Sequence, residues 1–192
     1  SSNLCGNVFV GNTIYRTSMN LAGLYNSTVY NNNVEGYIGL GPNSVAYNNT
    51  ADKIESATLT KDNKNVVVYN NTVNDVVMGC EGSVYNNVIN RAVTLNADNV
   101  KLYDNIISGT VTVNSNGNEI TDNKITSTGD YTIDLGDTSN NKVSDNYLIA
   151  VTALGDGSVK GNIENNVVEH NYPLVADINI DASNVFIGQN TT

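Results

Sequence analysis

The feature that most constrains this chain is a short repeat built around asparagine. A polar residue, an asparagine and, two positions later, an apolar residue recur ten times, at intervals of 16 residues (Asn71 to Asn87) to 24 residues (Asn166 to Asn190), although the last copy is weaker. A unit of about 20 residues cannot bury its own apolar side chains, so neighbouring copies must stack on one another. The anchor asparagines are Asn12, Asn32, Asn49, Asn71, Asn87, Asn105, Asn123, Asn146, Asn166 and Asn190.

The positions around each anchor alternate in the way that strands require. The residue three before the anchor is apolar in every copy, from Phe9 to Ile187, and the residue two after it is apolar from Ile14 to Val168. Strand residues point alternately inward and outward, so both columns face a core. Equivalent strands one copy apart then pair in parallel. The alternative, a sandwich of hairpins, would give no reason for one asparagine column that runs through every copy. We expect an all-β fold, a right-handed single-stranded parallel β-helix of about ten coils and roughly 45 Å.

The excess of asparagine, 36 of 192 residues, fits tight turns better than helices. Asparagine competes for backbone hydrogen bonds inside a helix but tolerates left-handed turn geometry. Stacked at strand spacing, each anchor carboxamide can donate to one neighbour and accept from the other, which predicts an internal Asn ladder. We assign this column a structural role and no chemistry.

Charge and composition weigh against several classes of function. The net charge is −10 and the nine Lys and Arg residues are scattered, whereas binding to phosphates needs a basic patch, so no nucleic-acid partner is expected. No segment approaches the roughly 18 apolar residues of a membrane helix, and no membrane insertion is expected. Cys5 and Cys80 fall four coils apart, about 19 Å, which predicts no disulfide between them. No cofactor is expected.

The repeat fills the chain, which predicts one β-helix domain over residues 1–192, either whole or a segment of a longer surface protein. Little sequence remains beyond the first and last copies to cover the open strand edges, and uncovered edges invite pairing. We therefore expect either end-to-end self-association or flanking repeats of the same chain.

An aromatic column is the most distinctive surface feature. Tyrosine stands two residues before the anchor in five consecutive copies, directly after an inward-facing residue, so alternation places its ring outside. Such a stripe can bind an extended glycan through its ring faces and phenol groups. In the other interpretation the rings stack on one another and stiffen the sheet. The column consists of Tyr30, Tyr47, Tyr69, Tyr85 and Tyr103.

A second column, immediately before the anchor, is acidic in three copies. Asp104, Asp122 and Asp145 occupy a position that other copies fill with Asn. Glycoside hydrolysis needs two carboxylates roughly 5–10 Å apart across the scissile bond, and the two arginines, Arg16 and Arg91, lie in distant copies. We interpret the three aspartates as turn residues and assign no catalytic residue.

The longer copies carry loops, and loops are where a site is most often held. Asp130, Asp134 and Asp137 are weak calcium candidates because their carboxylates could supply oxygen ligands, but their spacing matches no known calcium loop; no other metal site is expected. His170 is the only histidine and, without a nearby nucleophile, is interpreted as a surface residue. Four N-x-S/T sequons permit glycosylation; they begin at Asn26, Asn48, Asn70 and Asn190.

Units of the form V-Y-N-N-x-V or L-Y-D-N-I-I begin at Val29, Val68, Val84 and Leu102. They resemble the right-handed parallel β-helix repeats of archaeal, methanogen-type adhesin-like surface proteins. The resemblance implies a non-enzymatic extracellular or cell-surface module, which is a structural stalk or binds a glycan or a cell-surface protein through the tyrosines. Two alternatives stay open. A carbohydrate-active enzyme, of polysaccharide lyase or hydrolase type, needs a groove with clustered acids and a cation, and a virion tailspike segment predicts trimerisation.

Overall fold

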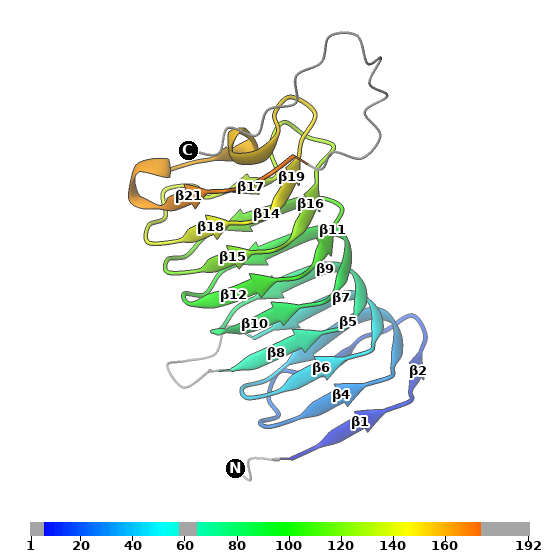
Figure 1. Ribbon diagram of the computed structural model, residues 1–192. Coiled ribbons are helices and arrows are strands. Elements are labelled where there is room, and N and C mark those ends of the chain that lie inside the picture. The colour runs from blue at the N-terminus through cyan, green and yellow to red at the C-terminus, as the bar shows by residue number, and fades with distance from the viewer. Residues whose placement is uncertain (1–5, 58–64, 174–192) are drawn as a thin grey trace, which may run out of the picture.

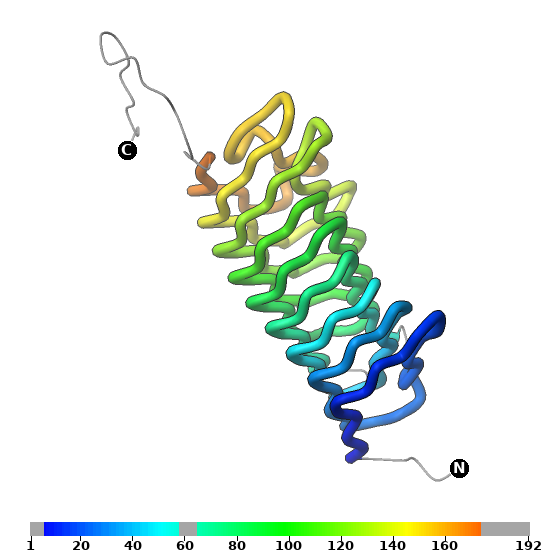
Figure 2. Tube along the Cα trace, turned by 90° about the vertical axis from the view of Figure 1, so that its right-hand side faces the viewer, coloured from blue at the N-terminus to red at the C-terminus, as the bar shows by residue number. Residues whose placement is uncertain are grey.

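The computed structural model describes residues 6–57 and 65–173, which form a right-handed parallel β-solenoid of about 7 turns (Figure 1). The chain is all-β, as the repeat predicts, and Figure 2 shows its coils stacked into one continuous rod. The expected number of ten coils is too high for this part of the chain. Asn190 lies outside the described residues, and the last described coil contains two 3-10 helices besides its short strands.

The first sheet has nine parallel strands, each paired with the equivalent strand of the next repeat. Its register aligns equivalent repeat positions, so that Val84 lies beside Val68 on one side and Leu102 on the other. The strands are, in order, β1 (Val8–Val10), β4 (Thr28–Tyr30), β6 (Val45–Tyr47), β8 (Val66–Tyr69), β10 (Gly82–Tyr85), β12 (Val100–Tyr103), β15 (Glu119–Thr121), β18 (Lys142–Ser144) and β21 (Val167–Glu169).

The second sheet has twelve strands and covers the other two sides of each coil, because its long strands bend across a corner. The bent strands are β5 (Asn33–Leu40), β7 (Thr50–Ser56), β9 (Thr72–Met78) and β11 (Val88–Leu95). Before the corner lie β2 (Thr13–Ile14), β13 (Ile106–Ile107), β16 (Lys124–Thr126) and β19 (Tyr147–Ile149), and after it β3 (Met19–Leu21), β14 (Thr110–Val113), β17 (Ile133–Asp134) and β20 (Val159–Lys160). Two 3-10 helices, η1 (Gly155–Ser158) and η2 (Ile163–Asn165), flank β20.

The two inward columns meet in one continuous apolar core. Residues three before the anchor, from Val29 to Val143, are completely buried, and those two after it, from Val34 to Leu148, are also buried. Full burial of a Val, Leu or Ile side chain stabilises a fold by about 1.5–3 kcal/mol. Truncation of one of them, such as Leu102→Ala, therefore costs about 2–5 kcal/mol, including the cavity it leaves.

The Asn ladder is present at the junction of the two sheets. Each anchor from Asn12 to Asn146 donates its side-chain amide to the carboxamide oxygen of the next anchor at 2.8–3.0 Å. The same oxygen also accepts the backbone N–H of the donating residue, for example from Asn71 to Asn87 at 2.9 Å. These buried polar groups are satisfied from coil to coil, which is why a polar residue can occupy an inward turn.

The assignment of Asn166 as the ninth anchor is wrong. Asn146 donates to Asn171, and Asn166 instead ends a second, shorter ladder with Asn118 and Asn141, at the opposite end of the first sheet. The sequence pattern missed Asn171 because its second following residue is Pro173, which lacks a backbone N–H and is a poor strand residue. The longer turn through η1 and η2 accounts for the 25 residues between Asn146 and Asn171.

Other expectations fall beyond the described residues. Cys5 lies outside them, so its predicted lack of a bridge to Cys80 stays a prediction. Cys80 itself is a buried free thiol whose pKa is raised above its usual value, chiefly by burial. The sequon at Asn190 and the C-terminal part of the last repeat are also outside.

Candidate functional site

The predicted tyrosines form a stacked column on the outside of the first sheet, here called the Tyr stripe. It contains Tyr30, Tyr47, Tyr69, Tyr85 and Tyr103, from β4, β6, β8, β10 and β12. Neighbouring ring centroids are 4.9–5.1 Å apart, and their planes differ by 1–12°. That separation is close to the strand spacing, so the rings stack without distorting the sheet. The stripe ends where Val10 and Thr121 occupy the same column.

Stacking limits what the Tyr stripe can offer to a ligand. Each inner ring is covered on both faces by its neighbours, so its edge and its phenol hydroxyl remain for contacts. Desolvation raises the pKa of Tyr47 above 10.0, and negative charge on Tyr30 and Tyr69 would raise it further. The pKa of Tyr103 is also raised, with desolvation again the first cause. The stripe therefore presents a row of hydroxyl groups and ring edges rather than an open platform of ring faces.

The residue before each anchor has left-handed backbone geometry. The φ angles of Asp104, Asp122 and Asp145 are 55°, 56° and 61°, in the region that Asp, Asn and Gly tolerate better than other residues. Their interpretation as turn residues is confirmed. His170 occupies the same turn position with φ of 55° and is exposed, as expected for a surface residue. Two of the sequon asparagines, Asn48 and Asn70, are exposed in this row as well.

The three calcium candidates are not gathered into a site. Asp134 forms an ion pair with Lys160 of the next coil at 3.0 Å and accepts the backbone N–H of Gly136. Asp130 and Asp137 are exposed. Within residues 6–57 and 65–173, no three His, Cys, Asp or Glu side chains come together in a way that could hold a metal ion.

A charged cluster that sequence reasoning missed lies where the second sheet bends. Arg91 sits in a β-bulge of β11 and forms a bidentate ion pair with Asp75 of β9, with 3.2 Å between Nε and Oδ1. Its Nη2 is also 3.7 Å from Oδ1 of Asp52 on β7. The hydrogen bond and charge of Asp75 raise the pKa of Arg91. Arg91 and Asp75 each stand four residues after their anchors, Asn87 and Asn71, so a comparison of equivalent repeat positions could have found this pair.

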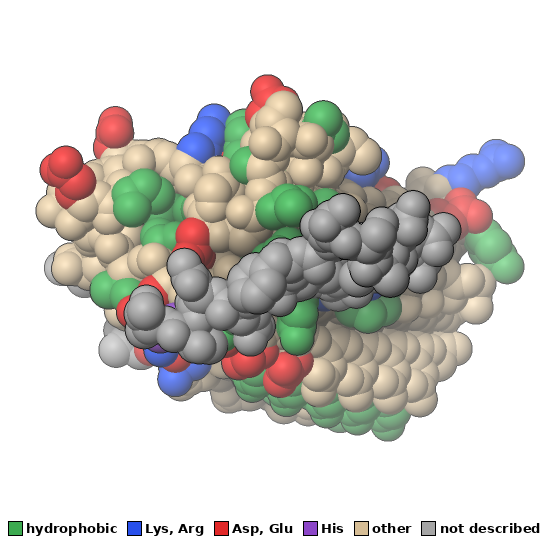
Figure 3. All heavy atoms as spheres, turned by 45° about the horizontal axis from the view of Figure 1, so that its top comes forward, with side chains coloured by type: hydrophobic (Ala, Val, Ile, Leu, Met, Phe, Trp, Pro, Cys, Tyr) green, Lys and Arg blue, Asp and Glu red, His purple; other side chains and the backbone are tan. Residues whose placement is uncertain are grey.

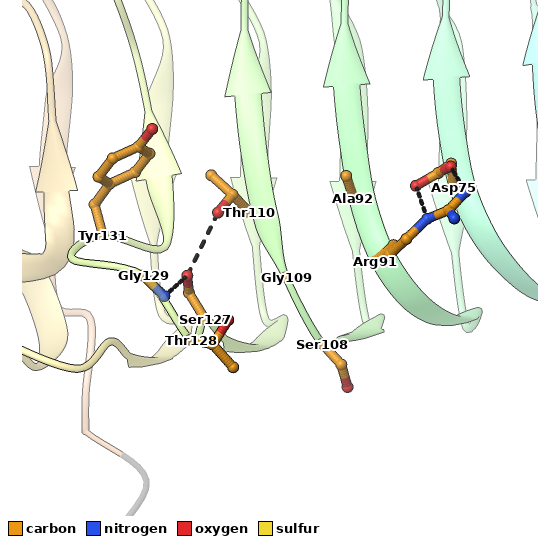
Figure 4. A pocket seen from close by; sticks show the side chains of 10 residues that line it. All are labelled: Asp75, Arg91, Ala92, Ser108, Gly109, Thr110, Ser127, Thr128, Gly129 and Tyr131. Atoms are coloured by element: carbon orange, nitrogen blue, oxygen red, sulfur yellow. Dashed lines mark hydrogen bonds and ion pairs between the residues drawn. The ribbon is translucent and has the colours of Figure 1, made fainter.

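A groove begins beside this cluster and follows the corner toward the C-terminal end (Figure 4). Its volume is about 570 Å³, and it extends from Arg91 to Tyr131. The corner residues between these two ends are small, and they leave the surface hollow. A Cβ atom on Gly109 would lie 1.3 Å from the carbonyl oxygen of Arg91, so only glycine fits there. The lining between the ends is Ala92, Ser108, Gly109, Thr110, Ser127, Thr128 and Gly129, with Asp75 beside Arg91.

The face of the rod at its C-terminal end is mixed in charge (Figure 3). Viewed toward the C-terminal end, Lys and Arg side chains lie dispersed among acidic ones (Figure 3). No helix of the described residues has the length and apolar character needed to cross a membrane. Compared with models of protein families, with curated proteins and with solved structures, the chain matches none of them at a significant level.

Proposed function

We propose that this chain is a non-enzymatic, rod-forming module of an extracellular surface protein, a structural stalk of the adhesin-like kind. The observation that carries the proposal is the coincidence of two uninterrupted ladders in the same coils. Asparagine amides from Asn32 to Asn105 are linked inside, while rings from Tyr30 to Tyr103 stack outside. If one coil bends or slides against the next, the Asn ladder and the stacked tyrosine rings are both disturbed. The two ladders together therefore favour a stiff rod.

Asp52, Asp75 and Arg91 at one end of the groove are the clustered acids and cation that an enzyme needs, but the contacts of the carboxylates favour the stalk. Asp75 is held by Arg91, and Asp134 by Lys160. The column from Asp104 to Asp145 occupies left-handed turns. Hydrolysis of a glycosidic bond needs one carboxyl group to protonate and another to attack or activate water. Carboxylates that are committed to ion pairs or turns are poorly placed for those steps.

Two measurements on the purified chain test the stalk proposal. Incubation with polysaccharides should release no reducing ends and no unsaturated products, whereas turnover would show a carbohydrate-active enzyme. Small-angle X-ray scattering over a range of concentrations should show an elongated particle that is not a trimer. A stable trimer would instead favour a tailspike segment.

A second candidate function rests on the outward hydroxyl groups of the Tyr stripe, which repeat with the 4.9–5.1 Å spacing of the rings. Such a row could bind a glycan or a cell-surface protein along the rod. Tyr69→Phe with Tyr85→Phe removes two hydroxyl groups but keeps the stacking, and Tyr69→Ala with Tyr85→Ala removes both. A glycan titration should weaken in both variants, and unchanged affinity would argue against this function.

A further inference from the structure

We propose that the corner groove between Arg91 and Tyr131 binds a short neutral oligosaccharide. The groove lies on the bend of the second sheet, whereas the Tyr stripe lies on the first sheet. It is therefore a separate site, and it goes beyond the stalk function.

The shape of the groove comes from a change in corner residues along the rod. The corner carries Asp75 and Arg91 on β9 and β11, but Ser108 and Gly109 in the next coil and Thr128 and Gly129 in the one after. The close approach of Gly109 to the backbone of Arg91 prevents any side chain from filling the floor. A ligand can therefore lie against the backbone across two coils, about 10 Å at strand spacing.

Hydrogen-bonding groups lie at one end of the groove and on its floor. Asp75 and Asp52 engage Nε and Nη2 of Arg91, and Nη1 has no partner among the described residues. The Asp75 contact fixes the orientation of the guanidinium plane, so less side-chain freedom is lost on binding. On the floor, the hydroxyl groups of Thr110 and Ser127 lie 3.4 Å apart and can each donate or accept.

The far end of the groove supplies an aromatic ring. The ammonium of Lys160 lies 3.7 Å from the ring centroid of Tyr131. Unlike the rings of the Tyr stripe, Tyr131 stacks on no other aromatic ring in the described part of the chain. One ring face is thus left without an aromatic or cationic partner. An aromatic face beside hydroxyl donors suits the C–H surface of a sugar ring.

The charge of the chain favours a neutral ligand over an anionic one. The net charge of the chain is −10, and the charge of Arg91 is offset by Asp75 and Asp52. A polyanionic glycan is repelled by this field, while a neutral sugar meets no such barrier. Because the groove is open, we expect weak binding, with a Kd of about 1 mM.

The test is an NMR titration of the full chain, labelled with 15N, with cellotriose, maltotriose and mannotriose, and with trigalacturonate as the charged comparison. At least one neutral trisaccharide should give saturable shifts in the amides of residues 108–110 and 127–131. Tyr131→Ala should weaken binding about fivefold to tenfold, and Thr128→Trp, which fills the groove from an exposed position, should abolish it. Tyr15→Ala is the matched control on an exposed tyrosine away from the groove, and it should bind as the wild type does.

The absence of saturable shifts with every neutral trisaccharide would overturn the proposal. Shifts that survive Thr128→Trp and Tyr131→Ala, or that are larger with trigalacturonate, would overturn it too. Native spectra of each variant verify that it folds, so a loss of shifts reports the groove. None of these results bears on the stalk function, which depends on turnover and the solution state.

Discussion

Asn171 donates both its backbone N–H and its side-chain amide to Oδ1 of Asp156, at 3.2 and 2.5 Å. Each rung of the Asn ladder from Asn12 to Asn146 directs its backbone N–H and one side-chain N–H toward the C-terminal end. A chain of donors with one direction must finish on an acceptor, and an ionised carboxylate is a strong one. Asp156 thus ends the ladder with a charged side chain, where a further asparagine would have left donors unpaired.

Removal of this terminal acceptor should loosen the last coil. We expect Asp156→Ala to lower the free energy of unfolding by about 1–3 kcal/mol, because two donors of Asn171 lose their partner. Asp156→Asn keeps a side-chain oxygen and should cost less. Denaturant unfolding measures the change, and faster hydrogen exchange at Asn171 should accompany it. Asp137→Ala, at an exposed site, is the control; an equal loss there would contradict this role of Asp156.

Within the rod, neighbouring asparagines should respond differently to mutation. Asn87→Ala removes the acceptor of both donors of Asn71 and should cost about 1–3 kcal/mol. Asn86 is exposed with φ of 55°, so Asn86→Gly should change stability by only a few tenths of a kcal/mol. Equal effects in urea unfolding of the two variants would show that the ladder does not stabilise the rod.

Two glycines in the groove provide a further contrast. A Cβ on Gly109 would overlap the carbonyl oxygen of Arg91, whereas a Cβ on Gly129 would lie 3.5 Å from Oγ of Ser127, at ordinary contact distance. Gly109→Ala should therefore lower the thermal midpoint and cost at least about 2 kcal/mol, while Gly129→Ala should be tolerated. A fully stable Gly109→Ala chain would contradict the close approach of these two coils.

The Tyr stripe should make stability fall at high pH. The pKa of Tyr47 is raised above 10.0 in the folded chain, whereas an unfolded tyrosine has a pKa of about 10. Below pH 10 both states are protonated and the contribution is complete; as pH rises through the folded pKa, the unfolded state gains from losing its proton and stability falls. Chemical unfolding across this range should show a smaller fall in Tyr47→Phe. An equal fall in both chains would contradict the assignment to Tyr47.

Much of the fold could be predicted from the sequence because the repeat encodes it directly. The apolar columns around Val84 and Ile89 are buried, and the Tyr stripe stands outside in the predicted coils. Each of these predictions depends on alternation within one strand and on identical positions one coil apart. Those relations follow from backbone geometry alone.

The parts that could not be predicted are those where coil length changes. Asn166 carried the anchor pattern but lies at the other end of the first sheet, since two 3-10 helices lengthen its coil. By contrast, the contact between Arg91 and Asp75 follows the repeat, since both residues stand four positions after their anchors, and it could have been predicted. Ring stacking in the Tyr stripe was one of two interpretations, and ring orientation depends on side-chain torsions that a residue pattern does not specify.

The most direct test of the proposed stalk function is the force needed to unfold single chains held at their two ends. We expect Tyr69→Ala, which removes the ring between Tyr47 and Tyr85, to lower the unfolding force of the central coils. Tyr69→Phe keeps the ring and should unfold at the wild-type force, because stacking rather than the hydroxyl group supports the rod. An unfolding force that is the same in Tyr69→Ala as in the wild type would contradict a stalk that is stiffened by its Tyr stripe.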